Sequence, residues 1–317
     1  MRPMRTARTA LLLGWRLHRA ELVAVMIAAL GLSIAALSIA AALDRITADC
    51  RAATVVVAPC GGLTEMGQIY DSATNTQMYL AMQGLAVLPF AAAVVLGVAL
   101  VAREIEQGTA LLAWPLARSR GRWLAGRILP VALIGALILL VPAMAGDVLI
   151  RSLYPGVDPG GNFEGYGIRG ALLVVRFGAV LILAALVGAW IGRQLPALLV
   201  AAVLAAGLGI GVQQVRPYLF EAVEQPQSIR FIDRVGNSYV ATRYRDADGR
   251  WMREEDAWEL LATAGDRPGP DMPEEVFFAI PRERYPDVVL RESLVLVAVG
   301  GLLSGALVLV ISRRRPG

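Results

Sequence analysis

Six long apolar segments, separated by polar ones, constrain the fold of this chain more than any other feature of its sequence. A helix needs about 20 apolar residues to cross a bilayer, and each segment approaches or exceeds that length. The segments are residues 22–43, 78–102, 128–150, 170–191, a fifth that follows the turn 192–196 and ends near residue 212, and 288–311. The mean hydropathy of +0.58 is also too high for an ordinary soluble domain. The sequence predicts an all-α polytopic membrane protein with six transmembrane helices.

Arginines are distributed unevenly among the polar segments. Fourteen arginines against three glutamates lie in 1–21, 103–127, position 193 and the tail after 311, whereas the short connections between them are acidic or neutral. Because cytoplasmic loops of membrane proteins carry the excess of arginine, we expect a multi-pass protein of the cell membrane with both termini in the cytoplasm. The net charge of +4 then reflects topology and lipid-bilayer contact, and we expect no nucleic-acid partner.

The two ends of the chain are rich in arginine, unlike the apolar spans. Residues 1–21 interleave arginines with leucines and Trp15, which favours an amphipathic elbow helix along the inner membrane surface. A secretory signal is not predicted, because Arg16, His18 and Arg19 interrupt its apolar core. Residues 22–212 hold helices 1 to 5, and 288–317 hold helix 6 and a basic cytoplasmic tail.

Residues 213–287 predict a small α+β extracytoplasmic insertion between helices 5 and 6. Its main part, 216–287, has ten arginines and fifteen acidic residues. Residues 238–252 indicate two short strands around an Asp-Gly turn, and 256–264 a short helix. Two aspartates before Gly249 resemble the start of a calcium loop, but the further acidic ligands are missing, so a simple hairpin turn is favoured.

The composition excludes several kinds of site. All thirty basic residues are arginine, so the chain cannot build a phosphate-binding P-loop or a lysine-dependent catalytic site. One histidine and two cysteines are too few for the usual zinc sites, and no metal site is expected. We therefore expect a protein that is not itself an enzyme and holds no cofactor of its own.

Three sets of residues outside the predicted insertion are structural candidates. Cys50 and Cys60 lie in an outer loop at a spacing that suits a disulfide, with two unpaired thiols as the alternative. Arg176 and Asp147 lie at similar depth in neighbouring spans, and a buried charge needs a partner, so an intramembrane pair is the hypothesis, with a snorkelling arginine as the alternative. Small residues one helical turn apart predict close helix packing, within the chain or with a second copy or relative of it, at Gly207, Gly211, Gly301 and Gly305.

A short charged segment, 103–127, separates the second and third spans. It begins with Glu104 and Glu106, contains five arginines and has good helix formers up to Leu112, so the second helix could extend into the cytoplasm and break at Pro115. The sequence AREIEQGTALLAWPLARSRGRWLAGR resembles the loop after the second transmembrane helix of type-2 ABC exporter permeases, especially those of actinomycetes. A looser similarity precedes the last helix, at Pro281, Arg284, Tyr285 and Glu292.

This resemblance implies a function. The chain would be the permease subunit of an ATP-driven exporter, paired with itself or a paralogue and bound to a separate ABC ATP-binding subunit that holds ATP and Mg²⁺. Segment 103–127 would be the coupling loop, with contacts to the ATPase expected from Glu104, Glu106, Gly108, Thr109, Arg118 and Arg122. The alternatives are a merely topogenic basic loop and, for the whole chain, a non-transporting sensor or scaffold whose acidic outer domain binds a ligand.

Overall fold

The computed structural model describes residues 14–52, 73–109, 119–153, 161, 163–219, 222–225, 237–264 and 273–313. Six long helices dominate it, and each has an apolar window long enough to cross a membrane. They are α2 (Arg19–Ala52), α4 (Ala73–Glu106), α6 (Arg120–Leu153), α7 (Gly170–Ile191), α8 (Gln194–Leu219) and α11 (Tyr285–Arg313). The six predicted spans and the mostly helical fold class are confirmed. Of the predicted elbow, residues 1–13 lie outside the described residues, and 14–17 are helical.

Several helices are longer than the apolar segments that revealed them. Helix α2 continues to Ala52, so Cys50 lies in a helix and not in the loop that we expected. Helix α6 begins at Arg120, so the last part of segment 103–127 is helical too. Hydropathy marks only the part of a helix that lipid can surround, whereas alanine, leucine and arginine propagate a helix further into polar surroundings.

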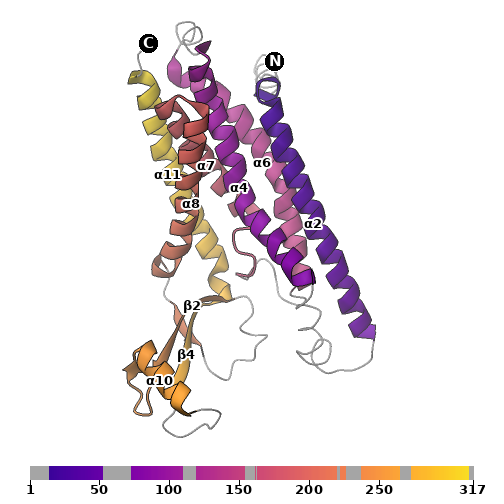
Figure 1. Cartoon of the computed structure of the whole chain (residues 1–317), viewed down its shortest axis with the longest axis vertical. Coiled ribbons are helices and arrows are strands. Elements are labelled where there is room, and N and C mark those ends of the chain that lie inside the picture. The colour runs from indigo at the N-terminus through magenta and orange to yellow at the C-terminus, as the bar shows by residue number, and fades with distance from the viewer. Residues whose placement is uncertain are drawn as a thin grey trace. The chain divides into compact units, whose positions relative to one another are not determined.

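The helices form one compact unit, made of Met1–Pro155, Gly165–Gly211 and Leu290–Gly317. Within it α4 packs most extensively on α7, and α2 on α6 (Figure 1). Gly97 of α4 permits this closeness, because a side-chain Cβ there would lie 2.5 Å from the carbonyl oxygen of Leu181 on α7. The core between the helices is apolar, and fully buried side chains include Leu96, Leu100, Leu139, Leu173, Phe177 and Leu181.

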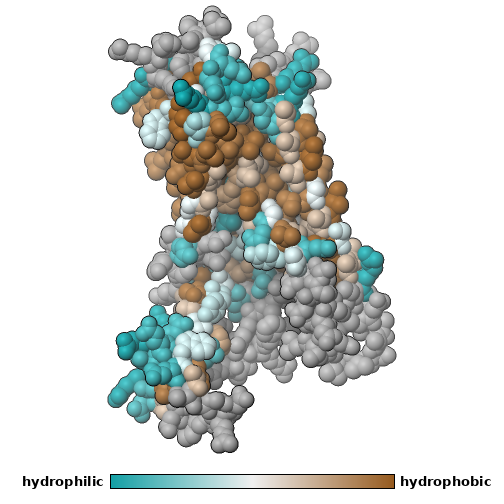
Figure 2. Space-filling model, in the orientation of Figure 1, coloured by the Kyte–Doolittle hydropathy of each residue, from teal (hydrophilic) through white to brown (hydrophobic). Residues whose placement is uncertain are grey.

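Helices α8 and α11 are less enclosed than the others. In α4, 72% of the most apolar window is buried, whereas in α8 and in α11 the share is 17%. Figure 2 shows the apolar belt that the helical unit presents, with hydrophilic side chains gathered beyond it at the end where α2 begins and α11 ends in Figure 1. The outward faces of α8 and α11 are thus free for lipid or for another chain.

The second unit consists of Gly156–Glu164 and Val212–Val289. Its described residues form a four-stranded antiparallel sheet in the order β1-β4-β2-β3, the α-helix α10 (Glu254–Ala264) and the short 3-10 helix η2 (Arg282–Arg284). The strands are β1 (Val223–Gln225), β2 (Ser238–Arg245), β3 (Trp251–Met252) and β4 (Glu274–Ile280). The predicted hairpin and short helix are confirmed, while β1 and the central strand β4 were not predicted.

The hairpin turn between β2 and β3 is formed by Asp246. Its Oδ1 atom accepts hydrogen bonds from the backbone N–H groups of Asp248, at 3.0 Å, and Arg250, at 2.7 Å. The aspartate therefore satisfies the turn's own backbone, as such side chains commonly do. These hydrogen bonds confirm the interpretation of the segment as a hairpin turn.

Candidate functional site

The segment expected to couple to an ATPase lies at the end of the helical unit where α4 ends and α6 begins, which we call the connector end. Helix α4 stops at Glu106, and two residues later Gly108 has a φ of +70°, so α4 does not continue unbroken towards Leu112 as the sequence allowed. Thr109 is helical again, and residues 110–112 lie outside the described residues. A left-handed glycine ends a helix even where helix formers follow. Thr109 Oγ1 donates to the carbonyl of Glu104 at 3.1 Å, and residues 110–118, including Arg118, lie outside the described residues.

Two ion pairs fasten α4 to its neighbours at this end. Arg103 Nη1 lies 2.9 Å from Glu21 Oε1 on α2, and Arg127 Nη1 of α6 lies 3.0 Å from Glu104 Oε1. The Glu104 side chain is only 14% exposed. Its carboxylate therefore holds two helices together within the chain and is not presented as a contact for a partner.

Glu106, the last residue of α4, contacts the start of α8. Its Oε2 atom accepts a hydrogen bond from the backbone N–H of Gln194 at 2.9 Å. The first amides of a helix have no partner inside the helix, and a negative charge there also faces the positive end of the helix dipole. A side chain that satisfies such an amide stabilises a helix by about 0.5–2 kcal/mol. Glu106 thus caps α8 from another helix.

Arg120, the first residue of α6, contacts the end of α11 in the complementary way. Its Nη1 atom donates to the backbone carbonyls of Ile311 at 2.7 Å and Ser312 at 2.9 Å. The last carbonyls of a helix lack internal partners, and a positive charge stabilises them. Arg120 was not predicted as a site residue, and its position inside an arginine-rich segment gave no signal that it would differ from the others.

Arg122 is the predicted contact residue whose side chain stays available. Its backbone N–H donates a hydrogen bond to Ser119 Oγ at 3.2 Å, and its side chain is exposed and makes no hydrogen bond or ion pair within the part of the chain that the structure describes. Thr109 and Glu106 are also exposed at this end, whereas Gly108 is partly buried. Of the predicted contact residues, Glu104 and Glu106 therefore bond to other helices of the chain, whereas the side chain of Arg122 faces outward.

His18 lies beneath the same charged groups, immediately before α2. It is 4% exposed, and neither ring nitrogen has a hydrogen-bond partner among the described residues. Burial lowers the pKa of His18 below its ordinary value, Glu21 opposes this, and Arg127 and Arg103 add to it. The ring is therefore held in its neutral form.

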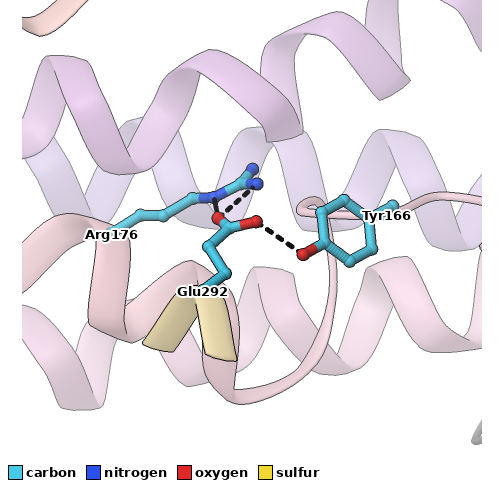
Figure 3. Close-up of polar contacts among 3 residues, drawn as sticks. All are labelled: Tyr166, Arg176 and Glu292. Carbon is cyan, nitrogen blue, oxygen red and sulfur yellow. Dashed lines mark hydrogen bonds and ion pairs between the residues drawn. The ribbon is translucent and has the colours of Figure 1, made fainter. Parts of the chain in front are cut away.

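The predicted pair of Arg176 and Asp147 is wrong, because the structure gives each residue another partner. Arg176 Nη2 on α7 lies 2.7 Å from Glu292 Oε1 on α11, and its Nε atom donates to the same oxygen at 2.8 Å (Figure 3). Asp147 Oδ1 instead lies 3.6 Å from Arg169 Nη1. The two arginines stand seven residues apart at the start of α7, and the sequence alone did not tell which would reach which carboxylate.

Tyr166 completes the Arg176–Glu292 pair. Its hydroxyl donates a hydrogen bond to Glu292 Oε2, and its ring lies 5.5 Å from the Arg176 guanidinium carbon (Figure 3). Arg176 and Glu292 are each 7% exposed, so both carboxylate oxygens are matched where water is scarce. Charges at membrane depth are tolerated when they are paired and hydrogen-bonded in this way. The cluster fastens α11 to α7.

Gly167 makes room for this cluster. Its φ is +85°, and a side-chain Cβ at this position would overlap the Arg176 guanidinium. Gly165 and Gly170, on either side, also have positive φ. The chain before α7 therefore folds back against Arg176, and Arg169 within it is only 2% exposed. Irregular backbone beside spanning helices has to be buried in protein in this manner.

The remaining predicted residues do not form a site within the chain. A Cβ at Gly207, Gly211, Gly301 or Gly305 would meet no atom within 4 Å among the described residues, so packing inside the chain is not what these glycines provide. Close packing was instead found at Gly97, which the spacing rule did not select. Cys60 lies outside the described residues, as does the side chain of Cys50, so the disulfide stays a prediction.

The contacts described above join helices of the chain to one another. Polar groups gather at the connector end and around Arg176, and apolar helices lie between them. A family model described as ABC-2 membrane transporter related matches residues 22–216, which is more than half of the chain and runs from α2 into α8. No curated protein and no solved structure matches.

Proposed function

Because the chain belongs to the ABC-2 membrane transporter related family, we propose that it is the permease subunit of an ATP-driven exporter. Members of this family are membrane subunits that lack an ATPase site of their own. The lysine-free sequence agrees with this, since a P-loop cannot be built from it. The observation that carries the proposal is the family match across five of six apolar helices.

In this proposal the energy comes from a separate ABC ATPase that binds ATP and Mg²⁺ and docks at the connector end. The excess of arginine at that end supports its placement in the cytoplasm. Exposed Arg122 offers a charge-assisted contact to an acidic surface of the ATPase. Two permease chains, identical or related, would form the path, and the uncovered faces of α8 and α11 are where a second chain or lipid would lie.

The cargo in this proposal is an amphipathic or lipid-like molecule that leaves the cell. This cargo class is what the resemblance to type-2 ABC exporter permeases implies.

The test is co-purification from native membranes. A tagged chain is expected to bring down an ABC ATPase and to show ATP hydrolysis. Arg122→Glu is expected to weaken this association, because it reverses the charge that faces the partner. Arg151→Glu is the matched control, since Arg151 is an exposed arginine in the last turn of the same helix, at its opposite end.

The absence of any ATPase from the purified complex would overturn the proposal. It would favour a non-transporting sensor or scaffold, in which the acidic outer region binds a ligand. Equal loss of the ATPase with Arg122→Glu and Arg151→Glu would refute docking at the connector end in particular.

A further inference from the structure

Helices α8 and α11 bury little of their apolar surface within the chain, and at its start α11 is held to α7 by the Arg176–Glu292 pair. Only 17% of the apolar window of each is buried, against 72% for α4 and 56% for α7. Their glycine-bearing faces meet open space, as the four positions Gly207, Gly211, Gly301 and Gly305 show within the described part of the chain. These two helices can therefore move with less loss of packing than the others.

The two ends of one short segment hold these two helices. We call residues 107–119 the connector. Glu106, just before the connector, accepts from the backbone N–H of Gln194 at the start of α8. Arg120, just after it, donates to the backbone carbonyls of Ile311 and Ser312 at the end of α11. All four positions belong to the helical unit.

The two helix-end contacts, of Glu106 with α8 and of Arg120 with α11, are of intermediate strength. A helix cap shifts the equilibrium between the bonded and the unbonded helix end by about two- to thirty-fold. This is enough for a loosely packed helix to move together with the residue that caps it. It is too little to drag α2 or α7, which large apolar interfaces keep in place. The ion pairs of Glu21 and Glu104 join helices that are already packed together, so they add rigidity there.

We propose that Glu106 and Arg120 are positioning residues that carry movement of the connector to α8 and α11. When the ATPase displaces the connector, the adjoining ends of α4 and α6 shift with it, so that α8 follows Glu106 and α11 follows Arg120. Helices α2 and α7 and the remaining length of α4 and α6 keep their packing. This rests on the proposed function, since it needs an ATPase at the connector end. It assigns to Glu106 an internal role in place of the expected contact with the partner.

The experiment uses the full complex in lipid nanodiscs, with Cys50 and Cys60 replaced by serine. An environment-sensitive fluorophore is attached to Val203→Cys on α8 or to Leu302→Cys on α11, both of which are exposed. The signal is the change in emission when nucleotide is trapped with vanadate. Co-purification of the ATPase and basal ATP hydrolysis are measured in the same samples.

Glu106→Ala is expected to reduce the nucleotide-dependent change at Val203→Cys by about fivefold or more, and to leave that at Leu302→Cys intact. Arg120→Met is expected to do the reverse. Glu106→Gln should restore most of the signal, because an amide oxygen still accepts from the Gln194 N–H. Gln107→Ala, at an exposed neighbouring position, is the matched control. Association with the ATPase should be unchanged in all of them.

Two results would overturn the proposal and are distinguishable. If Glu106→Ala and Arg120→Met keep full nucleotide-dependent signals, the contacts are static caps and carry no movement. If both signals fall together in either variant, the helices are not moved separately. A wild-type chain that binds no ATPase refutes the proposed function itself, and this proposal with it.

Discussion

Arg176 Nη2 lies 2.7 Å from Glu292 Oε1, and this contact joins helices α7 and α11 although the two residues are 116 positions apart in the sequence. Neither α7 nor α11 could bury its charge alone, because a lone ion at this depth costs several kcal/mol. The pair is therefore a condition for the two helices to lie together, and it can be tested by removing either partner or both.

Removing one partner should be worse than removing both. Arg176→Met or Glu292→Leu alone is expected to lower stability by about 3–5 kcal/mol, because an uncompensated charge stays buried. The double variant should recover most of this loss. Thermal unfolding in detergent, followed by size-exclusion chromatography, measures the three variants. Arg253→Gln, in a pair whose arginine is 80% exposed, should change little.

Tyr166→Phe should have a smaller effect of the same kind. It removes the hydroxyl that donates to Glu292 and leaves the ring beside Arg176. A hydrogen bond to a charged group contributes about 1.5–3 kcal/mol. Tyr239→Phe is the control, because its hydroxyl shares an exposed hydrogen bond with Thr242. Equal unfolding temperatures for the two variants would contradict the role of Tyr166 in the cluster.

Two glycine-to-alanine changes should have opposite signs. Gly97→Ala places a Cβ 2.5 Å from the Leu181 carbonyl oxygen and 2.7 Å from Ala184 Cβ, so α4 and α7 must separate. Overpacking of this kind costs about 1–3 kcal/mol. Gly126→Ala on α6 meets no atom within 4 Å among the described residues and should stabilise the helix by about 0.5–1 kcal/mol. The unfolding assay above distinguishes them.

His18 should make stability fall as the pH is lowered. Burial sets its folded-state pKa below the value of about 6.5 expected in the unfolded chain. Its contribution is complete above about pH 6.5 and decreases below it, because the unfolded chain takes up a proton that the folded chain resists. The slope is at most about 1.4 kcal/mol per pH unit. His18→Leu should remove this part of the difference between pH 7.5 and pH 5.5, and an unaltered difference would refute it.

Topology is testable with a membrane-impermeant maleimide on intact cells. In a background without Cys50 and Cys60, Asp248→Cys should react and Gln107→Cys should not. Both positions are exposed, so a permeant maleimide should label each and serves as the control. Labelling of Gln107→Cys from outside would reverse the topology and remove the basis for ATPase docking at the connector end.

The helices were predictable because apolar runs of this length leave a chain few alternatives. Their ends were not. The sequence allowed α4 to extend towards Leu112, since the residues there favour helix, but α4 ends at Glu106 and Gly108, two residues later, is left-handed. Strand β4 has the sequence EEVFFAI, in which the apolar residues are consecutive and do not alternate with polar ones, so its pattern gave no clear signal.

Partners of charged residues were the least predictable part. Arg176 was correctly identified as a buried charge in need of a counter-ion, but Asp147 was chosen because its helix is adjacent in the chain. Glu292 carried a comparable signal, since it is an acidic residue near the start of an apolar helix, at a depth similar to that of Arg176. Which helix lies beside α7 is decided by tertiary packing, which hydropathy does not encode.

Glu106 and Arg120 contact α8 and α11 through main-chain atoms only. Glu106 accepts from a backbone amide and Arg120 donates to backbone carbonyls, so neither contact depends on the side chains of the helix that it holds. Almost any residue except proline, which lacks the amide hydrogen, would serve at position 194. The surfaces of these two helices could therefore diverge to suit new molecules in the membrane while their mechanical linkage to the rest of the protein persisted.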